Sequence, residues 1–387
     1  MRRLRLGVIG AGSWALSSHL PAFAARADEL EFAAVARRGR AQLEQVRDRY
    51  GFAVASEDYR DVLEAGVDVC LIASPTGLHH EHAKAAMEAG AHVLVEKPFT
   101  IEPADAWDLV ETAERLGRHL VVAFGWNWKP MVRDLHALVA RHGIGEVEQV
   151  SVQMASVTRE LLSNTGAYPD AAPESVPEQA TWTDPRLSGG GYAQAQLTHA
   201  LGLALRLTGL RAESAFALMS APLQAPVELH DAIAVRYAGG AIGTVAGGST
   251  HEGAGGNKHQ LEVRAIGSEG QLQIDVEREI AWLWTDGGRV DVRLDVRDGD
   301  GAYDCDGPPN ALLDLALGRD VENHSPGELA ARTVELLDAA YRSARSGRLE
   351  AVAQRPGGGD AAAGAAGTAA GGAAGSAGGP QAGEPAS

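Results

Sequence analysis

A glycine-rich segment directly after an apolar run constrains the fold of this chain more than any other feature. Residues 4–9 are mostly apolar and lead into GAGSWA (residues 10–15), which fits the pattern G-x-G-x-x-A and continues into a helix-compatible stretch. In such a turn Gly10 permits a sharp bend, Gly12 lets backbone amides approach a pyrophosphate, and Ala15 allows close helix packing. Taken alone, this sequence pattern also fits an ordinary glycine turn. Their place after a strand favours a dinucleotide site that includes Gly10, Gly12, Ser13 and Trp14.

Strand and helix patterns alternate through the rest of the first 125 residues. Strands are expected at 31–36, 52–55, 69–73, 92–95 and 120–124, and helices at 41–50, 59–65, 79–89 and 103–116. Strands separated by helices of this length form a parallel sheet with helices on both faces. We therefore predict a doubly wound Rossmann domain over residues 1–125.

After residue 125 the alternation of strands and helices gives way to longer strands of alternating polarity, separated by glycine turns. They predict an α+β domain over 126–350 with one large, open, mainly antiparallel sheet, flanked by helices at 192–207 and 326–346. Residues 163–186 are rich in proline and polar side chains and are expected to form a loop over the site. The alanine- and glycine-rich segment 356–387 is expected to be a disordered tail.

Charge and cysteine content exclude several classes of partner. The net charge of −17, with no basic stripe, argues against nucleic acid and anionic membrane surfaces, and no apolar run is long enough to span a membrane. The two cysteines, Cys70 and Cys305, fit a reducing cytoplasm better than a disulfide framework. Arg2-Arg3 before an apolar stretch could be misread as an export signal, but that stretch is already explained as strand, turn and helix.

Two residues are candidates for proton transfer. Lys97 follows a buried-type strand, so its ammonium can reach a reacting centre, although a solvated loop lysine fits the same pattern. His199 lies on an apolar helix after the glycine triplet 189–191, where a packed core histidine is the default interpretation. The cluster His79, His80 and His82 invites a metal hypothesis, but it lacks ligands to close a site, so no metal is expected.

Several spaced motifs in the right order resemble the Gfo/Idh/MocA oxidoreductases, named for glucose-fructose oxidoreductase and inositol dehydrogenase. The resemblance covers about residues 4–350. It rests on the G-x-G-x-x-A fingerprint (residues 10–15) with HLP at 19–21, on SPTGLH at 74–79, on GAHVLVEKP at 90–98, and on the glycine triplet with His199. Two further segments that resemble the family lie later in the chain, IGSEG at 266–270 and AAYRS at 339–343. Spaced motifs of this kind are far more specific together than any one of them.

This resemblance implies hydride transfer between a nicotinamide cofactor and a hydroxyl or carbonyl of a sugar, sugar derivative or cyclitol. It implies catalytic roles for Lys97, beside the nicotinamide, and for His199 as the acid/base. It also implies an oligomer, a dimer or tetramer, formed through the open sheet. Cofactor contacts are expected on these grounds from Ser74, Pro75, His79, Glu96 and Lys97.

One position departs from the family pattern. Many members carry an aspartate four residues before the histidine, whereas this chain has Ala195, so Gln196 or Asn127 could take over substrate positioning, or the reaction could differ from alcohol oxidation. The same hydride geometry would serve an imine or enone. Trp126 and Trp182 are either core aromatics or part of a sugar pocket.

The turn after the second strand bears on cofactor choice. An NAD site usually places a carboxylate there, but Ala36 is followed by Arg37, Arg38, Gly39 and Arg40. Because a guanidinium pairs with a 2′-phosphate, Arg37 and Arg38 favour NADP over NAD. Two functions stay open: an oxidoreductase that uses Lys97 and His199, and a regulator that binds the cofactor without chemistry.

Overall fold

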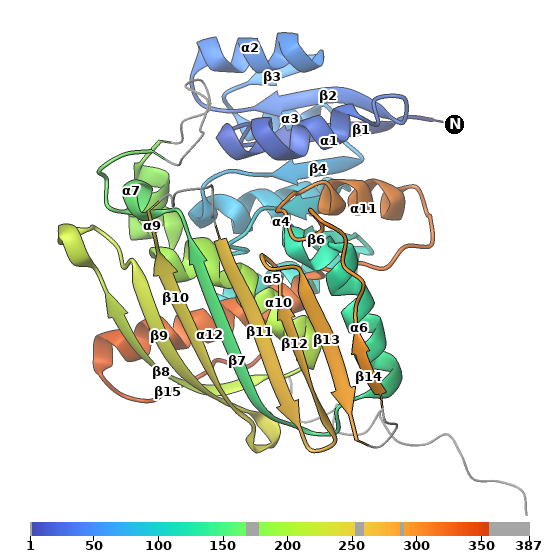
Figure 1. The fold of residues 1–387 in the computed structure, drawn as a ribbon. Helices are drawn as coiled ribbons and strands as arrows, with labels where there is room; N and C mark the ends of the chain where they lie inside the picture. The colour runs from blue at the N-terminus through green and yellow to red at the C-terminus, as the bar shows by residue number, and fades with distance from the viewer. Residues whose placement is uncertain (1, 168–177, 252–258, 287–289, 356–387) are drawn as a thin grey trace, which may run out of the picture. The chain divides into compact units, whose positions relative to one another are not determined.

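The computed structural model describes residues 2–167, 178–251, 259–286 and 290–355 of the chain (Figure 1). Residues up to Ala353 form one unit, and the segment from Gln354 onward forms a second. The expected disordered tail, 356–387, lies outside the described residues, as do residues 168–177 of the loop expected over the site. All the elements named below belong to the first unit.

Six parallel strands form the first sheet, in the order β3-β2-β1-β4-β5-β6. Their bounds are β1 (Leu4–Ile9), β2 (Leu30–Ala36), β3 (Val54–Ser56), β4 (Val69–Ile72), β5 (His92–Val95) and β6 (Leu120–Val122). Strands β4 and β6 consist of apolar residues that are buried throughout, as expected for a parallel sheet covered on both faces. The predicted strands are all present; β3 lies two residues later than expected at its start.

Helices cover both faces of this sheet. On one face, α3 (Tyr59–Glu64), α4 (His79–Glu88) and α5 (Pro103–Leu116) contribute Val62, Met87 and Trp107 to one core cluster. On the other face, α1 (Leu20–Ala24) and α2 (Arg40–Tyr50) contribute Phe23 and Leu43 to another. The predicted doubly wound Rossmann fold is therefore confirmed.

Nine strands form the second sheet, in the order β14-β13-β12-β11-β7-β10-β9-β8-β15. Their bounds are β7 (Val147–Ser156), β8 (Ala212–Ser220), β9 (His230–Tyr237), β10 (Ile242–Ser249), β11 (His259–Gly267), β12 (Gly270–Asp275), β13 (Ile280–Thr285), β14 (Val290–Arg293) and β15 (Glu350–Ala351). Every neighbouring pair is antiparallel except β7 with β10. The predicted open, mainly antiparallel sheet is confirmed.

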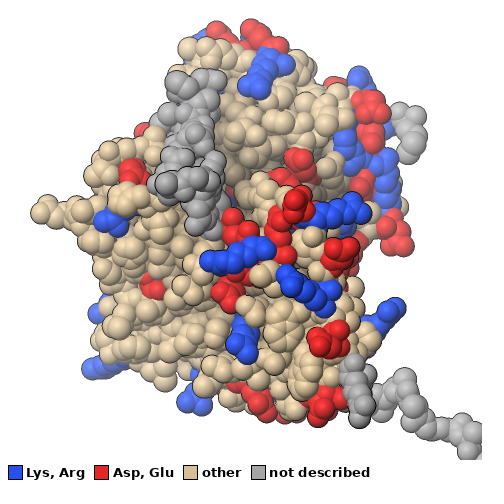
Figure 2. Space-filling model, viewed as in Figure 1, with Lys and Arg blue, Asp and Glu red and all other residues tan. Residues whose placement is uncertain are grey.

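In the described part of the chain, helices pack on one face of the second sheet and leave the other face uncovered. Helices α6 (Pro130–His142), α10 (Thr198–Thr208) and α12 (Gly327–Ser346) lie behind the strands in Figure 1, and their apolar residues share one core with the inward-facing strand residues. The outward-facing positions include Leu218, Ile242 and Trp284, which are 66%, 55% and 41% exposed. Figure 2 shows charges of both signs interspersed on this side of the molecule, without a broad patch of one sign.

After the second sheet the chain returns to the first. Helix α11 (Gly307–Ala316) places Leu312 and Leu313 in the core beside Leu6 of β1, together with the preceding Cys305. This helix and α6 were not predicted, although each has proline in its first turn, where proline is common. The return matters because it brings residues 303–305 to the edge of the first sheet.

The shorter segments complete the path between the sheets. They are the helical turns η2 (Thr76–Leu78), η3 (Gly125–Trp128), α7 (Arg159–Leu162), α8 (Ala180–Thr183), α9 (Pro185–Ser188), η6 (Pro222–Gln224) and η7 (Ala238–Gly240), and the π-helical turns η1 (Ala15–His19) and η5 (Ala193–Leu197). The expected loop 163–186 thus contains α8 and the start of α9. Among the described residues, no helix has both the length and the apolar character that a membrane crossing requires.

Candidate active site

The carboxyl ends of β1 and β4 meet where the strand order reverses, the usual place for a ligand in an open α/β sheet. Gly10 directly follows β1 and has a φ of +92°, and a Cβ there would lie 2.3 Å from the backbone N of Ser74 after β4. A Cβ on Gly12 would meet nothing closer than the Gly10 carbonyl oxygen at 4.0 Å. Gly10 is thus required by the fold, whereas Gly12 borders open space over the start of the helix, as a pyrophosphate site requires.

The helix after the fingerprint holds Ser13 and Trp14 beside this space. It passes through η1, in which Ala15 is buried, as expected for close packing on the strand. The Trp14 ring stacks on Tyr303 with centroids 6.0 Å apart, and the Trp14 Nε1 is buried without a hydrogen-bond partner among the described residues. An unpartnered buried donor at this position is compatible with a bound cofactor that offers an acceptor.

The loop after β4 is tied down by histidines. His79 is buried, with Nε2 2.7 Å from the Ser74 carbonyl oxygen and Nδ1 2.9 Å from that of Pro98, so it joins this loop to the loop after β5. Burial lowers the pKa of His79. His82 Nδ1 contacts the Ser74 hydroxyl at 2.9 Å, and His80 Nε2 contacts Asp108 at 2.6 Å. His79 and His82 therefore both hold Ser74, whereas His80 bonds α5, and Pro75 lies in the loop after β4 that the first two hold.

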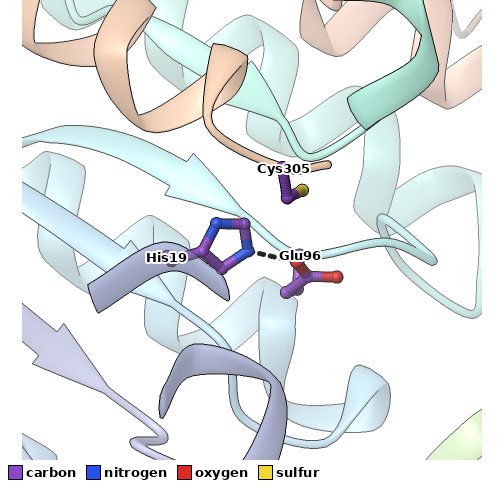
Figure 3. A group of neighbouring side chains, drawn as sticks. All are labelled: His19, Glu96 and Cys305. Atoms are coloured by element: carbon purple, nitrogen blue, oxygen red, sulfur yellow. Dashed lines mark hydrogen bonds and ion pairs between the residues drawn. The ribbon is translucent and has the colours of Figure 1, made fainter. Parts of the chain in front are cut away.

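Glu96 follows β5 and forms a buried pair with His19 (Figure 3). The His19 Nε2 contacts one carboxylate oxygen of Glu96, and the other oxygen accepts the Lys97 backbone N–H at 3.0 Å. Burial raises the pKa of the Glu96 carboxyl, but the hydrogen bond and the charge of His19, with that of Lys97, outweigh this and hold it below its ordinary value. The pair therefore holds the backbone from which the Lys97 side chain extends.

Cys305 lies beside this pair and completes a His, Glu, Cys group (Figure 3). Such a group could ligate a metal, but a ligating histidine normally donates its second ring N–H to an acceptor. The Nδ1 of His19 is buried and has no hydrogen-bond partner among the described residues. The geometry fits a histidine–carboxylate pair better than a metal site, and burial raises the pKa of the Cys305 thiol far above its ordinary value.

Lys97 reaches from the first sheet to the second domain. Its Nζ donates to the carbonyl oxygen of Ala195 in η5 at 3.0 Å and lies 5.9 Å from the centre of the Trp182 ring. Burial lowers the pKa of the Lys97 ammonium, and the nearby Glu96 only partly opposes this. At the position where the resemblance implies an aspartate, this chain therefore holds the lysine through the backbone oxygen of Ala195.

His199 lies one helical turn after Ala195, in α10. Its ring is 3% exposed and lies edge-on to three aromatic rings, with centroid distances of 4.9 Å to Trp126, 5.6 Å to Tyr303 and 6.1 Å to Phe124. The structure thus brings Lys97 and His199 to the same short helical segment, which includes a π-helical turn. Such turns are rare and often occur at functional sites.

The glycine triplet before η5 has a packing role. A Cβ on Gly190 would lie 2.1 Å from the Tyr341 hydroxyl, and one on Gly191 would lie 2.2 Å from the Glu228 carbonyl oxygen. Tyr341 donates to the Glu228 carboxylate at 2.5 Å, and the same carboxylate accepts from the backbone N–H of Gly191 at 2.8 Å. Gly190 and Gly191 therefore allow the close packing that positions the helix that carries His199.

The predicted substrate residues have different surroundings. Trp126 packs on His199 and Trp182 lies near the Lys97 ammonium. Asn127 is fully buried and donates to the carbonyl oxygen of His324 at 3.3 Å, while its own side-chain oxygen has no partner among the described residues. Gln196 is 7% exposed in η5. Trp126 and Trp182 are thus the two that contact the predicted catalytic residues.

The turn after β2 contains the two arginines expected to bind the adenosine ribose. Arg37 points inward, and its Nη1 donates to the Ala11 carbonyl oxygen at 3.0 Å, whereas Arg38 is exposed. The turn has no carboxylate of its own, but Glu57 reaches it from the end of β3 and accepts the Gly39 backbone N–H at 2.7 Å.

Three residues with a place in this site were not assigned to it from sequence: His19, Glu57 and Tyr303. His19 appeared only as part of a family motif, although a histidine two turns into the first helix could have been placed near the carboxyl edge. Glu57 follows a short strand and lies next to the β2 turn only because β2 and β3 are neighbours in the sheet. Tyr303 carries no local signal.

Comparisons with known proteins agree with this architecture. Residues 4–124 match the model of an oxidoreductase family with an NAD-binding Rossmann fold, and residues 132–273 match a GFO/IDH/MocA C-terminal domain. Levoglucosan dehydrogenase, solved with NADH and levoglucosan, aligns with a TM-score of 0.73 at 20% identity, covering 91% of this chain and 100% of that one. At this identity the similarity shows the fold.

Two named relatives are sugar dehydrogenases. D-glucoside 3-dehydrogenase of Escherichia coli is 30% identical over 210 residues, which is 54% of this chain and 55% of the relative. D-xylose 1-dehydrogenase (NADP(+)) 2 of Haloferax volcanii is 30% identical over 174 residues, 45% of this chain and 53% of the relative. Each match spans about half the length of the relative. With its nucleotide fold, its second domain and both family models in chain order, this protein belongs to the Gfo/Idh/MocA family of NAD-binding oxidoreductases.

Proposed function

We propose that this protein is an NAD(P)-dependent dehydrogenase that interconverts a hydroxyl and a carbonyl on a sugar, sugar derivative or cyclitol. The observation that carries the proposal is the contact of the Lys97 Nζ with the Ala195 carbonyl oxygen, one helical turn before His199. It joins the carboxyl edge of the nucleotide-binding sheet to the helix of the predicted acid/base. The named relatives that act on D-glucosides and D-xylose support the substrate class.

The residues of this chain account for the steps that surround hydride transfer. A nicotinamide cofactor bound at this edge would supply the hydride acceptor for oxidation of the carbinol carbon, or the hydride donor for reduction of the carbonyl. Lys97 donates a hydrogen bond to the substrate oxygen and orients it, and its lowered pKa lets it share a proton more readily than an ordinary lysine. His199 takes the hydroxyl proton on oxidation and returns it on reduction. The aromatic rings around His199 exclude water from this exchange.

The fit of the dinucleotide rests on the fingerprint and on the loops at the same edge. Gly12 borders open space, and Gly10, Ser74, Glu96 and Lys97 lie at the ends of the three adjacent strands β1, β4 and β5. Ser13, Trp14 and Pro75 lie in the same loops, and His79 positions Ser74. We propose that Arg38, with Arg37 behind it, accepts a 2′-phosphate, so that NADP is used in preference to NAD.

A regulator that binds the cofactor without chemistry is the second candidate, and Ala195 is the observation in its favour. The side chain at this position provides no carboxylate to orient a substrate or to tune His199. The presence of both Lys97 and His199 at one helical segment favours the enzyme.

The test is a titration of the purified protein with NADPH and NADH, followed by nicotinamide fluorescence. A panel of sugars, sugar derivatives and cyclitols is then assayed at the nicotinamide absorbance band, with the Lys97→Ala variant as the blank. Tight binding with substrate-dependent turnover that Lys97→Ala abolishes supports the proposal. Binding with no turnover on any substrate favours the regulator, and tighter binding of NADH contradicts the NADP preference.

Assembly and location are further parts of the proposal. The open face of the second sheet exposes Phe216, Leu218 and Ile242 and suits an interface with a second copy of this chain in a dimer or tetramer. Cys70 and Cys305 are both buried free thiols, which fits the cytoplasm. Size-exclusion chromatography with light scattering measures the assembly directly.

A further inference from the structure

We propose that Glu57 sets the dinucleotide preference of this protein, by supplying from the β3–α3 loop the carboxylate that the end of β2 lacks. The proposal rests on the proposed function, because it requires a dinucleotide at the fingerprint. In a site of this fold a carboxylate near the β2 turn accepts a hydrogen bond from the ribose 2′-hydroxyl of NAD. Here Glu57 is the side-chain carboxylate that bonds the backbone of that turn, within the described part of the chain.

The position of Glu57 follows from sheet geometry. Strand β3 pairs in parallel with β2, with Ser56 opposite Ala36, so the residues after both strands lie together at the carboxyl edge. The backbone N–H of Arg37 donates to the Ser56 carbonyl oxygen at 3.2 Å, which fixes the two loops against each other. Glu57 then accepts the N–H of Gly39 at 2.7 Å. The contact is therefore a consequence of the pairing of the two strands.

Gly39 also matters because it is the N-cap of α2. Its φ is +89°, and neither a capping side-chain hydrogen bond nor an acidic residue in the first turn satisfies the positive end of this helix. A 2′-phosphate would be attracted to that end and to its free N–H groups. Glu57 already occupies the Gly39 N–H. A phosphate oxygen on the same N–H would touch the carboxylate, far inside the roughly 8 Å screening length at physiological salt.

The two arginines do not cancel this effect. Arg37 is turned inward and is engaged with the Ala11 and Arg38 carbonyl oxygens, at 3.0 and 3.2 Å. Arg38 is exposed, and no ion pair joins Glu57 to either arginine within the described part of the chain. The exposed Arg38 guanidinium thus attracts a 2′-phosphate, while the Glu57 carboxylate on the Gly39 N–H repels it. The expected result is that both dinucleotides bind, with a preference for NADP that is weak because of the charge at residue 57.

The experiment measures Kd for NADPH and NADH on the full-length protein and on Glu57→Gln. The glutamine keeps the length and an oxygen acceptor for Gly39 but removes the charge. We expect Glu57→Gln to bind NADPH about tenfold more tightly and NADH no more tightly than the parent protein does. The matched control is Glu64→Gln, at the exposed far end of α3, which removes the same charge and should change either Kd by less than about twofold.

The outcomes separate this assignment from the proposed function. If the parent protein binds both dinucleotides and Glu57→Gln leaves their Kd ratio within about twofold, or if Glu64→Gln shifts the ratio equally, Glu57 is not the determinant. If the parent protein binds neither dinucleotide, the proposed function fails and the assignment fails with it. Thermal unfolding of each variant checks that the fold is intact.

Discussion

The candidate site has two sides, which are built in different ways. We call them the nucleotide wall, at the carboxyl ends of β1, β4 and β5, and the substrate wall, around His199. On the nucleotide wall, each residue lies within two positions of the end of its own strand: Gly10 and Glu96 directly follow β1 and β5, and Ser74 is the second residue after β4. On the substrate wall, neighbours in space come from distant parts of the chain, as when His199 of α10 meets Trp126 of η3 and Tyr303 before α11. A wall of the first kind depends on backbone geometry at single positions, and one of the second kind depends on packing between segments.

This difference predicts where substitutions act. On the nucleotide wall, one extra methyl group at a glycine can abolish the site because the neighbouring atoms are backbone and cannot move aside. On the substrate wall, the supporting contacts are mostly aromatic faces and helix positions, so a substitution removes a chemical group while the packing persists. Folding and cofactor binding should therefore respond mainly to the first wall, and turnover mainly to the second.

The largest effect is expected from Gly10→Ala. Its Cβ would lie 2.3 Å from the Ser74 backbone N, at a φ that alanine rarely adopts, so the free energy of unfolding should fall by about 3 kcal/mol or more. The matched control is Gly12→Ala, whose Cβ has 4.0 Å of clearance and should cost less than about 1 kcal/mol while weakening dinucleotide binding. Chemical denaturation and NADH titration measure both. Equal stability of the two variants would contradict the assigned roles of the glycines.

The same contrast explains how much could be predicted from sequence. The first sheet, the order of its helices and the positions of Gly10, Gly12 and Lys97 follow from local patterns, because strand, turn and helix are adjacent in the chain. The open second sheet could be predicted from its alternating strands. The Glu57 contact with Gly39 and the approach of Tyr303 to His199 could not, since they depend on strand pairing and on the return of the chain through α11. His199 has no local signal beyond its place on an apolar helix after the glycine triplet, so its predicted role depends on the family motif.

Next in size is the loss of turnover in Lys97→Ala. Removal of the ammonium should lower kcat by about 10²–10⁴-fold, because orientation of the substrate oxygen and proton sharing are both lost. Affinity for NADH should change much less, since the dinucleotide retains the fingerprint. Stopped-flow hydride transfer and equilibrium titration separate the two quantities. An equal loss of affinity and turnover would assign Lys97 to cofactor binding alone.

The pH profile of the same residue gives a second test. Burial lowers the pKa of Lys97, so if its cation orients substrate, activity should fall as pH rises through a value below the ordinary lysine range. Lys97→Arg keeps the positive charge at any accessible pH and should lose this alkaline limb, even if its kcat is lower. A limb that persists in Lys97→Arg belongs to another group.

A smaller loss of turnover is expected at His199, where two substitutions distinguish chemistry from packing. His199→Phe can retain the edge-on contacts with Trp126 and Tyr303, whereas His199→Asn retains polarity but not the ring. If the imidazole transfers the proton, both variants should lose about 10²-fold or more in kcat, and His199→Phe should keep most of its thermal stability. Activity that survives in His199→Phe would show that the ring serves only to pack the helix.

The smallest effect is expected where this chain departs from its family. Ala195 is 7% exposed and its carbonyl oxygen holds the Lys97 Nζ at 3.0 Å, so an aspartate there would place a carboxylate close to the ammonium. Ala195→Asp should raise the pKa of Lys97 and move the alkaline limb upward by about one pH unit, because a nearby negative charge favours the charged amine. Ala195→Asn, with similar shape and no charge, should leave the limb in place. If the alkaline limb does not move in a folded Ala195→Asp protein, the backbone oxygen alone holds Lys97 on the substrate wall. The chemistry of Lys97 is then independent of the missing carboxylate.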